Sequence, residues 1–392
     1  MIKVKYISTD TDISSGLFYS QVKILEKFSS TKFSFKCISI KNFFYEKKLK
    51  DIRQLTGWPM RYSNNIFWIL ILLISAFFLA LRIQESKTKY VYVGRGYYGG
   101  LIGYFLSKLG ENFVWDPRSI YPLEMLGAGK FSKHSLSFKF WLYLEKKISL
   151  KSIGIIVVSE GHGKYYKRYT QFGISKKTPQ IIVPCYGFSE DTQPTIKSLN
   201  KADKLLKKLS PEVPRIVYLG SLDDKWNNLS NYLPCFKNLL ISGFNLIIMT
   251  QSPVKNKILD YLSEACSVSI SDLESRIYLG DVRDETLQKI ILEKSDCGIM
   301  LIDKVPDWFS RLSVKFAYYR CAGLPVILSK HFGGAINYLK KEKSENYFYY
   351  PTNQPLKISK LSDYHRKNLK EKSLDFFSPR NFYIAIENFL KK

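Results

Sequence analysis

Histidines, paired cysteines and acidic side chains are scarce in this chain of 392 residues. It has four histidines, far apart in the sequence, and six cysteines without a Cys-x-x-Cys pair. Local zinc sites need closely spaced ligands, and disulfide frameworks are typical of short, cysteine-dense secreted chains. We therefore expect no metal site and no disulfide framework, and the scattered thiols favour a reducing compartment.

Negative charge is scarce because 34 Asp and Glu residues stand against 60 Lys and Arg residues, a formal net charge of +26. Such a surface attracts anions, for example nucleotide diphosphates, lipid phosphates or an anionic membrane face. A compositional bias toward lysine explains the same excess equally well. The lysines are spread along the whole chain, so the charge does not favour a nucleic-acid partner.

Long apolar runs are missing as well. The first residues, 1–7, hold too short an apolar stretch for a signal peptide and are typical of a first β-strand. The uncharged run 66–81, between Arg61 and Arg82, is shorter than the about 18 to 20 residues that span a bilayer. We expect a buried or membrane-surface helix there rather than a membrane span.

Strand-like apolar runs alternate with helical stretches along the chain, which is typical of parallel sheets built from βαβ units. In the first half we expect strands at 3–8, 34–40, 90–93, 112–116, 154–159 and 180–184. In the second half we expect strands at 215–219, 245–250, 277–279, 297–301 and 325–328. Helices are expected between them, notably at 15–28, 68–85, 99–109, 136–149, 224–242 and 313–321.

A stretch rich in Ser, Asp, Thr, Lys and Pro separates the two series and indicates a linker. The predicted fold class is α/β, with two Rossmann-like, doubly wound domains facing across a cleft between the carboxyl ends of their sheets. The expected boundaries are an N-terminal domain at 1–188, a linker at 189–213, a C-terminal domain at 214–378 and a terminal helix at 379–392.

The clearest chemical pattern lies between Ser310 and Val326. Ser313 can cap a helix there, and the free N–H groups at a helix start bind anions. Arg311 and Lys315 stand about one turn apart and can reach the same anion. A Gly-Leu-Pro turn then ends the helix before a buried strand.

This segment resembles the helix-plus-GlPV signature of GT-B glycosyltransferases, and is most like family 4, of the bacterial surface-polysaccharide type. Further stretches resemble that family's motifs in the same order: Ile156–Ser159, Val183–Phe188, Val217–Lys225, Ile277–Val282 and Ser295–Gly298. Near the start, Ser14-Ser15-Gly16 resembles its phosphate-facing loop, and Asp116-Pro117-Arg118 with Glu124 resembles an acceptor-side motif. Each motif is weak alone, but their order and spacing together are specific.

The resemblance implies an acceptor domain followed by a nucleotide-sugar donor domain. It implies a glycosyltransferase that moves a sugar from a nucleoside-diphosphate sugar to a lipid-linked or polysaccharide acceptor, in cell-surface polysaccharide or lipopolysaccharide biosynthesis. We expect retention of anomeric configuration, with no metal and no cofactor. The implied place is cytoplasmic, peripheral to the inner membrane; the partners are the nucleotide sugar, the acceptor and the membrane surface, with no nucleic acid.

The resemblance also implies roles for single residues. The catalytic, acceptor-side residues would be Asp116, Arg118 and Glu124. The donor-binding residues would be Gly16, Gly220, Ser221, Lys225, Arg311, Ser313, Lys315 and Tyr318. The cations among them would stabilise the departing diphosphate.

Three positions depart from the family pattern. Tyr318 and Ser310 stand where the family usually has glutamates, and Ser221 stands where it has an arginine. A phenol cannot accept hydrogen bonds from two ribose hydroxyls as a carboxylate does. The alternative is therefore a catalytically impaired GT-B homologue that acts as a binding or scaffold protein. A nucleic-acid-binding protein is a third, weaker alternative.

Other short motifs leave alternatives open. The glycines at 94, 96 and 99 match the spacing of a dinucleotide-binding loop, but a lone match is weak. Asp10-Thr11-Asp12 spells the DxD metal motif of a different transferase fold, and we interpret it as a turn. His162 is either a surface histidine or an acceptor-side residue.

Overall fold

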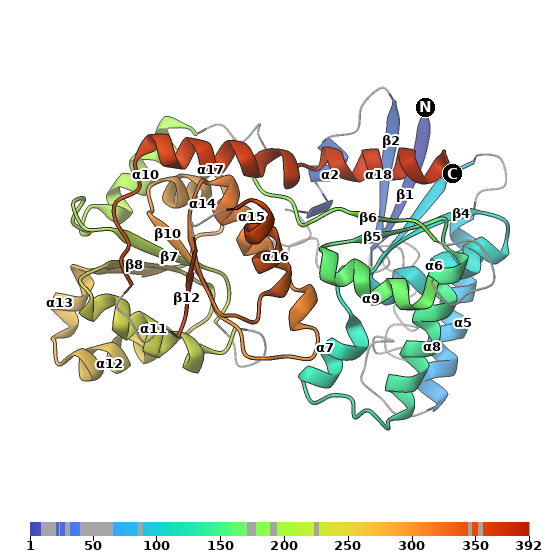
Figure 1. The fold of residues 1–392 in the computed structure, drawn as a ribbon, viewed down its shortest axis with the longest axis horizontal. Coiled ribbons are helices and arrows are strands. Elements are labelled where there is room, and N and C mark those ends of the chain that lie inside the picture. The colour runs from blue at the N-terminus through green and yellow to red at the C-terminus, as the bar shows by residue number, and fades with distance from the viewer. Residues whose placement is uncertain are drawn as a thin grey trace. The chain divides into compact units, whose positions relative to one another are not determined.

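The chain folds into two compact units, which we describe from a computed structural model (Figure 1). The structure describes residues 1–8, 21–22, 24–27, 32–39, 66–84, 89–170, 178–188, 194–222, 227–343, 347–351 and 356–391. The first unit comprises 1–184, 305–311 and 379–392. The second comprises 185–304 and 312–378. The assignment of an acceptor role to one and a donor role to the other stays a prediction.

The first unit is built on a sheet of six parallel strands in the order β2-β1-β3-β4-β5-β6. The strands are β1 (Ile2–Ser8), β2 (Phe33–Ser39), β3 (Val91–Arg95), β4 (Asn112–Asp116), β5 (Gly154–Val157) and β6 (Gln180–Ile182). The central strands are almost wholly buried, which is the pattern expected when helices cover both faces of a parallel sheet.

Helices connect these strands on the two faces of the sheet. They are α2 (Ile24–Lys27), α5 (Ile66–Ile83), α6 (Gly96–Lys108), α7 (Tyr121–Gly127), α8 (Leu136–Lys151), α9 (Glu160–Thr170) and α18 (Arg380–Leu390). The connections through α5, α6, α8 and α9 all advance in one direction across the sheet, so right-handed crossovers place these helices on one face. Within that layer α6 packs between α5 and α8.

Two segments from late in the sequence complete the first unit. The ring of Phe382 in α18 packs edge-on against Tyr6 of β1, with ring centroids 5.8 Å apart. The segment 305–311 is tied to α9, because the Ser159 hydroxyl donates to the Ser310 carbonyl at 2.7 Å. The first unit therefore includes one segment that lies, in sequence, between two strands of the second sheet and one that follows its last strand.

The second unit also has six parallel strands, in the order β12-β11-β10-β7-β8-β9. The strands are β7 (Arg215–Leu219), β8 (Asn245–Met249), β9 (Ile277–Gly280), β10 (Cys297–Met300), β11 (Val326–Leu328) and β12 (Tyr347–Tyr349). Starting from the β9 edge, the order is β9-β8-β7-β10-β11-β12. If β7 is counted as the first strand, this is the 3-2-1-4-5-6 order of the Rossmann fold.

The helices of the second unit cover both faces of this sheet. They are α10 (Ile196–Leu206), α11 (Leu229–Ile241), α12 (Lys255–Cys266), α13 (Ile270–Glu274), α14 (Glu285–Glu293), α15 (Val314–Cys321), α16 (Gly333–Lys341) and α17 (Asp363–Phe376). A short 3₁₀ helix, η2 (Trp308–Ser310), precedes α15 and belongs to the first unit.

The segment expected as a linker, 189–213, lies in the second unit. It carries α10, which begins with a capping box formed by Thr195 and Ser198. Ala202, Leu206 and Leu209 are buried in the second unit's core, and α10 packs against α14. The side of α10 that faces the core carries Ser198, Ala202 and Leu206, four residues apart, as expected for one face of a helix.

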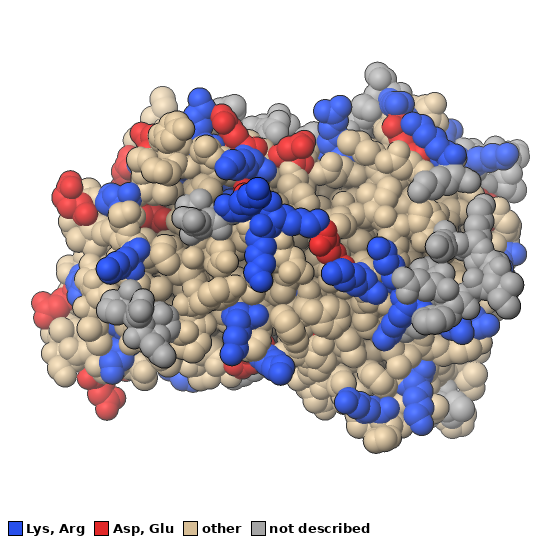
Figure 2. Space-filling model, in the orientation of Figure 1, with Lys and Arg blue, Asp and Glu red and all other residues tan. Residues whose placement is uncertain are grey.

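The predicted fold class, α/β with two Rossmann-like units, is confirmed, since every strand pairing of the two sheets is parallel. In the part of the chain that the structure describes, no helix combines the length and the apolar character that a membrane crossing requires. Figure 2 shows basic side chains scattered over one face of the molecule and fewer acidic ones among them.

Candidate functional site

The second sheet reverses its strand order between β7 and β10. Connections leaving β7 run to one side and connections leaving β10 run to the other, so no crossover covers the carboxyl ends at this point. Ligands of open α/β sheets bind in the crevice at such a switch point. The residues that follow Leu219 at the end of β7 are therefore the first place to look for a ligand site.

Gly220 and Lys315 meet at this switch point. Gly220 has a φ of +130°, and a Cβ built on it would lie 2.5 Å from Cε and 2.8 Å from Nζ of Lys315. The Lys315 ammonium group donates to Tyr218 Oη and to Asn227 Oδ1, both at 2.9 Å. The absent side chain at position 220 leaves the space through which the lysine reaches the end of β7.

The start of α15 adds a second positive group to the same place. Ser313 is its N-cap residue and accepts a hydrogen bond from the Lys315 amide at 3.1 Å. A helix start carries a partial positive charge and unpaired N–H groups. Lys315 lies in the first turn of this helix, so the lysine charge and the positive end of the helix dipole lie close together. This arrangement is suited to an anion such as a diphosphate.

Two further predicted donor residues lie in the second unit. The Ser221 carbonyl accepts a hydrogen bond from Tyr218 Oη at 2.6 Å, which places Ser221 beside the Lys315 contact. The Tyr318 ring, only 8 % exposed, stacks on Phe188 with centroids 4.3 Å apart and planes inclined by 12°. Tyr318 thus packs in the second unit's hydrophobic core, and its donor role stays a prediction.

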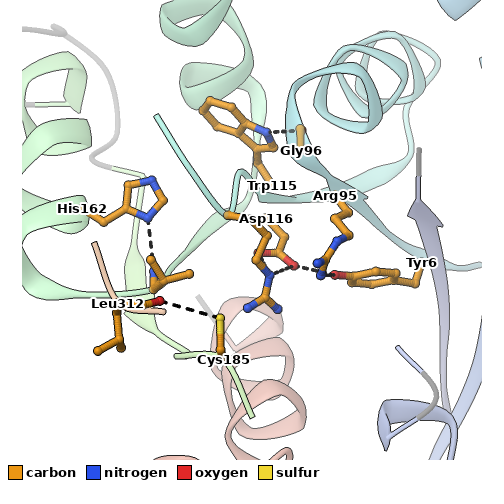
Figure 3. Close-up of polar contacts among 10 residues, drawn as sticks. Tyr6, Arg95, Gly96, Trp115, Asp116, His162, Cys185 and Leu312 are labelled. Carbon is orange, nitrogen blue, oxygen red and sulfur yellow. Dashed lines mark hydrogen bonds and ion pairs between the residues drawn. The ribbon is translucent and has the colours of Figure 1, made fainter. Parts of the chain in front are cut away.

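The first sheet has its own switch point, between β1 and β3. Arg95 and Asp116 are the last residues of β3 and β4 and pair in register there. The Tyr6 hydroxyl donates to Asp116 Oδ2 at 2.6 Å, and Arg95 Nη1 donates to the Tyr6 hydroxyl at 3.1 Å. Figure 3 shows Tyr6 and Arg95 directed toward the Asp116 carboxylate, which is completely buried.

Arg118 brings a guanidinium directly to the Asp116 carboxylate, whereas Arg95 reaches it through the Tyr6 hydroxyl. The Arg118 Nε lies 2.9 Å from Asp116, and the backbone φ of Arg118 is 59°. A left-handed backbone at a non-glycine residue is uncommon and is often found at functional sites. Asp116 and Arg118, both predicted on the acceptor side, therefore form one cluster with Arg95 and Tyr6. This cluster carries two positive charges against one negative charge.

Glu124 belongs to a neighbouring group in the first unit. It is half-buried on α7 and accepts a hydrogen bond from the Ser119 hydroxyl at 2.9 Å. Burial is the main cause that raises the pKa of Glu124; the negative charge of Asp307 raises it further, whereas Arg311 and Ser119 oppose the shift. A carboxyl with a raised pKa is a better proton acceptor, which fits a role in general base catalysis.

Arg311 pairs with Asp307, and both belong to the first unit. Its Nε lies 3.1 Å from Asp307 Oδ2, and its Nη2 donates to Oδ1 at 3.1 Å, a two-pronged pair. Gly127 of α7 faces Pro306, so α7 also holds this segment. The predicted joint action of Arg311 and Lys315 on one anion stays a prediction, because the two residues belong to different units.

His162, at the start of α9, is completely buried, so its interpretation as a surface histidine is wrong. Its Nδ1 accepts a hydrogen bond from the Val158 amide at 3.2 Å (Figure 3). Burial, and next the positive charge of nearby Arg118, lowers the pKa of His162 to about 3. The imidazole is therefore neutral, and it neighbours the loop that carries Asp116 and Arg118.

The glycine-rich stretch at the start of α6 packs closely against the sheet. A side chain on Gly94 would meet the backbone of Gly99, and one on Gly100 would meet the indole of Trp115. The indole N–H in turn donates to the Gly96 carbonyl at 3.0 Å (Figure 3). These glycines let β3, α6 and β4 approach one another, a structural reason for their spacing.

Some predicted residues cannot be placed. Gly16, Lys225 and the Asp10–Asp12 motif lie outside the described residues. Within the described ranges, no three His, Cys, Asp or Glu side chains are grouped to hold a metal ion. The expectation of a reaction without metal or cofactor stays a prediction.

Sequence reasoning missed two members of these clusters, Tyr6 and Asp307. Tyr6 lies in an apolar strand and has the pattern of a core residue, while Asp307 lies in a loop with no motif. Arg95 stands within the glycine-rich stretch and carries no motif of its own. The one available signal was position, since Arg95 ends a strand next to the switch point.

Comparisons with known proteins establish what this fold is similar to. No protein-family model matches the sequence, and no curated protein matches it. An α,α-trehalose-phosphate synthase (UDP-forming) from Burkholderia xenovorans, in complex with glucose-6-phosphate, matches with a TM-score of 0.62 and 11 % identity over 100 % of this chain and 99 % of that one.

Two other solved structures resemble the chain over nearly its whole length. A glycosyltransferase from Rickettsia africae has a TM-score of 0.60 and 15 % identity, covering 100 % of this chain and 99 % of its own. An E. coli trehalose-6-phosphate protein bound with UDP-2-fluoro glucose has a TM-score of 0.52 and 12 % identity, covering 98 % and 96 %. At such identities the likeness establishes the fold alone: the chain has the two Rossmann-like units of the GT-B glycosyltransferase fold.

Proposed function

We propose that this chain is a glycosyltransferase that moves a sugar from a nucleoside-diphosphate sugar to a lipid-linked or polysaccharide acceptor. The observation that carries the proposal is the position of Lys315 and the α15 start at the switch point of a Rossmann-ordered sheet. The full-length likeness to glycosyltransferase structures supports it. UDP-glucose is the first donor to test, because the E. coli neighbour is bound with UDP-2-fluoro glucose.

The donor half of the mechanism needs positive charge near the leaving group. Glycosyl transfer passes through an oxocarbenium-like transition state while the departing diphosphate gains negative charge. Fixed cations and helix N–H groups stabilise that charge without reorganising. Lys315 and the α15 start supply both, and Arg311 and Lys225 would add to the same field. No metal or cofactor takes part in the proposed reaction.

The acceptor half rests on the first unit. Arg95 and Arg118 would orient the acceptor; Asp116 holds Arg118 directly, and it holds Arg95 through the Tyr6 hydroxyl. Glu124 would take the proton of the acceptor hydroxyl, since the pKa of this carboxyl is raised.

The proposal also includes retention of anomeric configuration, membership of family 4 and a place in surface-polysaccharide synthesis. It further includes a cytoplasmic location and an acceptor at the inner membrane surface, where the net charge of +26 would favour anionic lipids.

The test is a thermal-shift screen against a panel of nucleotide sugars, nucleoside diphosphates and nucleosides. We expect a nucleotide sugar and its diphosphate to raise the Tm, and the matching nucleoside to raise it much less. Lys315→Met should abolish the shift, whereas Lys257→Met, at an exposed lysine of α12, should retain it. No shift with any compound, or an equal shift in both variants, would contradict the proposal.

A scaffold protein without turnover is the second candidate. The observation that favours it is the stacking of Tyr318 on Phe188, which directs the residue at the glutamate position into the core. This candidate predicts that a nucleotide sugar binds but is not hydrolysed or transferred. A donor-hydrolysis assay on the compounds that raise the Tm therefore separates the two candidates.

A further inference from the structure

The outer face of α5 exposes a row of large apolar side chains. Leu70, Ile74, Phe77, Phe78 and Leu81 are between 40 % and 59 % exposed. Their spacing puts them on one side of the helix, while Leu72, Ala76, Leu79 and Ala80 on the other side are buried in the first unit. We call these five exposed residues the apolar ridge. Contiguous exposed apolar surface of this kind marks an interaction site.

The ridge continues onto the next helix. The Phe77 ring meets Phe105 of α6 edge-on with centroids 5.5 Å apart, and Phe105 in turn contacts the Tyr104 ring. On the far side of α6, α8 exposes Leu136, Tyr143 and Leu150 at intervals of one heptad. The three helices lie in one layer, so apolar side chains occur across its outer surface.

The charges on this layer are almost all of one sign. Along α5, α6 and α8 the only acidic residue is Glu145, and it is completely buried. Its carboxylate accepts hydrogen bonds from Tyr97, Tyr165 and Arg168. The basic residues of the three helices are Arg82, Lys108, Lys139, Lys146, Lys147 and Lys151, and all but the half-buried Lys147 are exposed.

We propose that the outer face of α5, α6 and α8 docks the chain onto an anionic lipid bilayer. The apolar ridge would enter the boundary between headgroups and acyl chains, and the basic residues would contact lipid phosphates. The apolar ridge lies on α5 and most of the basic residues lie on α8, so the layer as a whole combines the apolar and basic surfaces that bind membrane interfaces. Lysine stems lie along apolar surface while their ammonium groups reach the phosphates.

Charge decides between a bilayer and a second copy of the chain. A symmetric dimer through this face would bring the same patch of both copies together. Like charges would then face each other with no acidic residue of the three helices available to pair with them. An anionic lipid surface supplies the complementary charge. The inference deepens the proposed function, because it names the surface through which the enzyme would reach a lipid-linked acceptor.

The test is co-sedimentation of the full chain with vesicles of phosphatidylcholine alone or mixed with phosphatidylglycerol. We expect at least about tenfold tighter binding to the anionic vesicles, with an affinity that falls as salt rises. The variant Leu70→Gln, Ile74→Gln, Phe78→Gln should bind at least about tenfold more weakly. The control Ile196→Gln, Ile241→Gln changes residues that are 79 % and 64 % exposed in the second unit, and should bind like the unchanged chain.

A charge variant gives an independent reading. Lys139→Glu with Lys146→Glu should lose the preference for anionic vesicles, whereas Lys255→Glu with Lys257→Glu on α12 should keep it. An unaltered thermal transition in each variant shows that it is folded. No vesicle binding, or equal binding by the ridge variant and its control, overturns the inference. A dimer in size-exclusion chromatography that only the ridge variant dissociates, without vesicle binding, also overturns it and identifies a second copy as the occupant.

The assay contains no sugar donor, so its failure and a failure of the proposed transferase activity remain distinguishable. Loss of vesicle binding with intact nucleotide-sugar turnover would reject the docking surface alone. Vesicle binding without turnover would reject the transferase and retain the surface.

Discussion

Gly220 and Lys315 occupy adjoining space at the end of β7: a Cβ on the glycine would lie 2.5 Å from Cε of the lysine. The glycine also has a φ of +130°, a conformation that side chains disfavour. A substitution at position 220 therefore meets two separate obstacles, one in its own backbone and one in the lysine.

Gly220→Ala is expected to lower the free energy of unfolding by about 1–3 kcal/mol. Gly243→Ala is the matched control, because Gly243 has a φ of +88° and open space around its Cβ position. The difference between the two variants isolates the clash with Lys315. In a Lys315→Ala background that difference should shrink, as measured by denaturant unfolding of all four variants. An undiminished difference would show that the lysine is not the obstacle.

Asp116→Asn should destabilise the first unit strongly, by about 3–5 kcal/mol, because it removes the buried negative charge that pairs with Arg118 and accepts from Tyr6, the hydrogen-bond partner of Arg95. Tyr6→Phe removes the hydrogen bond to the same carboxylate and the one from Arg95, and should cost less, about 2 kcal/mol. Denaturant unfolding of both variants measures the contrast. Similar losses for the two would mean that Asp116 is not the centre of the cluster.

Glu124 gives the stability a pH dependence with a defined sign. Its pKa is raised in the folded chain, so folding favours the protonated carboxyl. The resulting stabilisation is present below the unfolded pKa and is lost as the pH rises through the raised folded value. Relative to the unchanged chain, Glu124→Gln should gain stability over that pH window.

Unfolding curves at a series of pH values measure this gain. If the stability difference of Glu124→Gln is constant with pH, the carboxyl does not titrate as the structure indicates.

His162 should remain neutral down to strongly acidic pH, because burial and Arg118 lower its pKa to about 3. An NMR titration of the imidazole C–H signals reports this directly. The variant His162→Gln identifies the signal that belongs to the buried ring. A His162 signal that titrates near neutral pH would mean that the ring is accessible to solvent.

Most elements of the fold were predictable from local pattern. The predicted strand 112–116 coincides with β4, and the predicted strands 215–219 and 245–250 agree with β7 and β8 to within a residue. These strands are short apolar runs bounded by polar residues, which is the clearest signal of a buried parallel strand. The helix predicted at 136–149 extends two residues further, to Lys151, where α8 ends.

Local pattern could not predict which residues join which unit. Residues 305–311 join the first unit because of contacts far away in sequence, such as the Ser159 bond to the Ser310 carbonyl. Of the helix predicted at 224–242, the structure describes α11, which begins at Leu229 after the N-cap residue Asn228.

The candidate site was predicted in part: Asp116 and Arg118 do lie together, but their partners Tyr6 and Arg95 come from other strands.

The release of nucleoside diphosphate from a nucleotide sugar tests the central claim most directly. The donor is the compound that raises the Tm most, and the rate is compared between the unchanged chain, Lys315→Met and Lys257→Met. The account predicts measurable release that Lys315→Met slows at least about 100-fold, consistent with the loss of one preorganised positive group, while Lys257→Met matches the unchanged chain. Release that is absent for every donor, or equal in all three proteins, would contradict it.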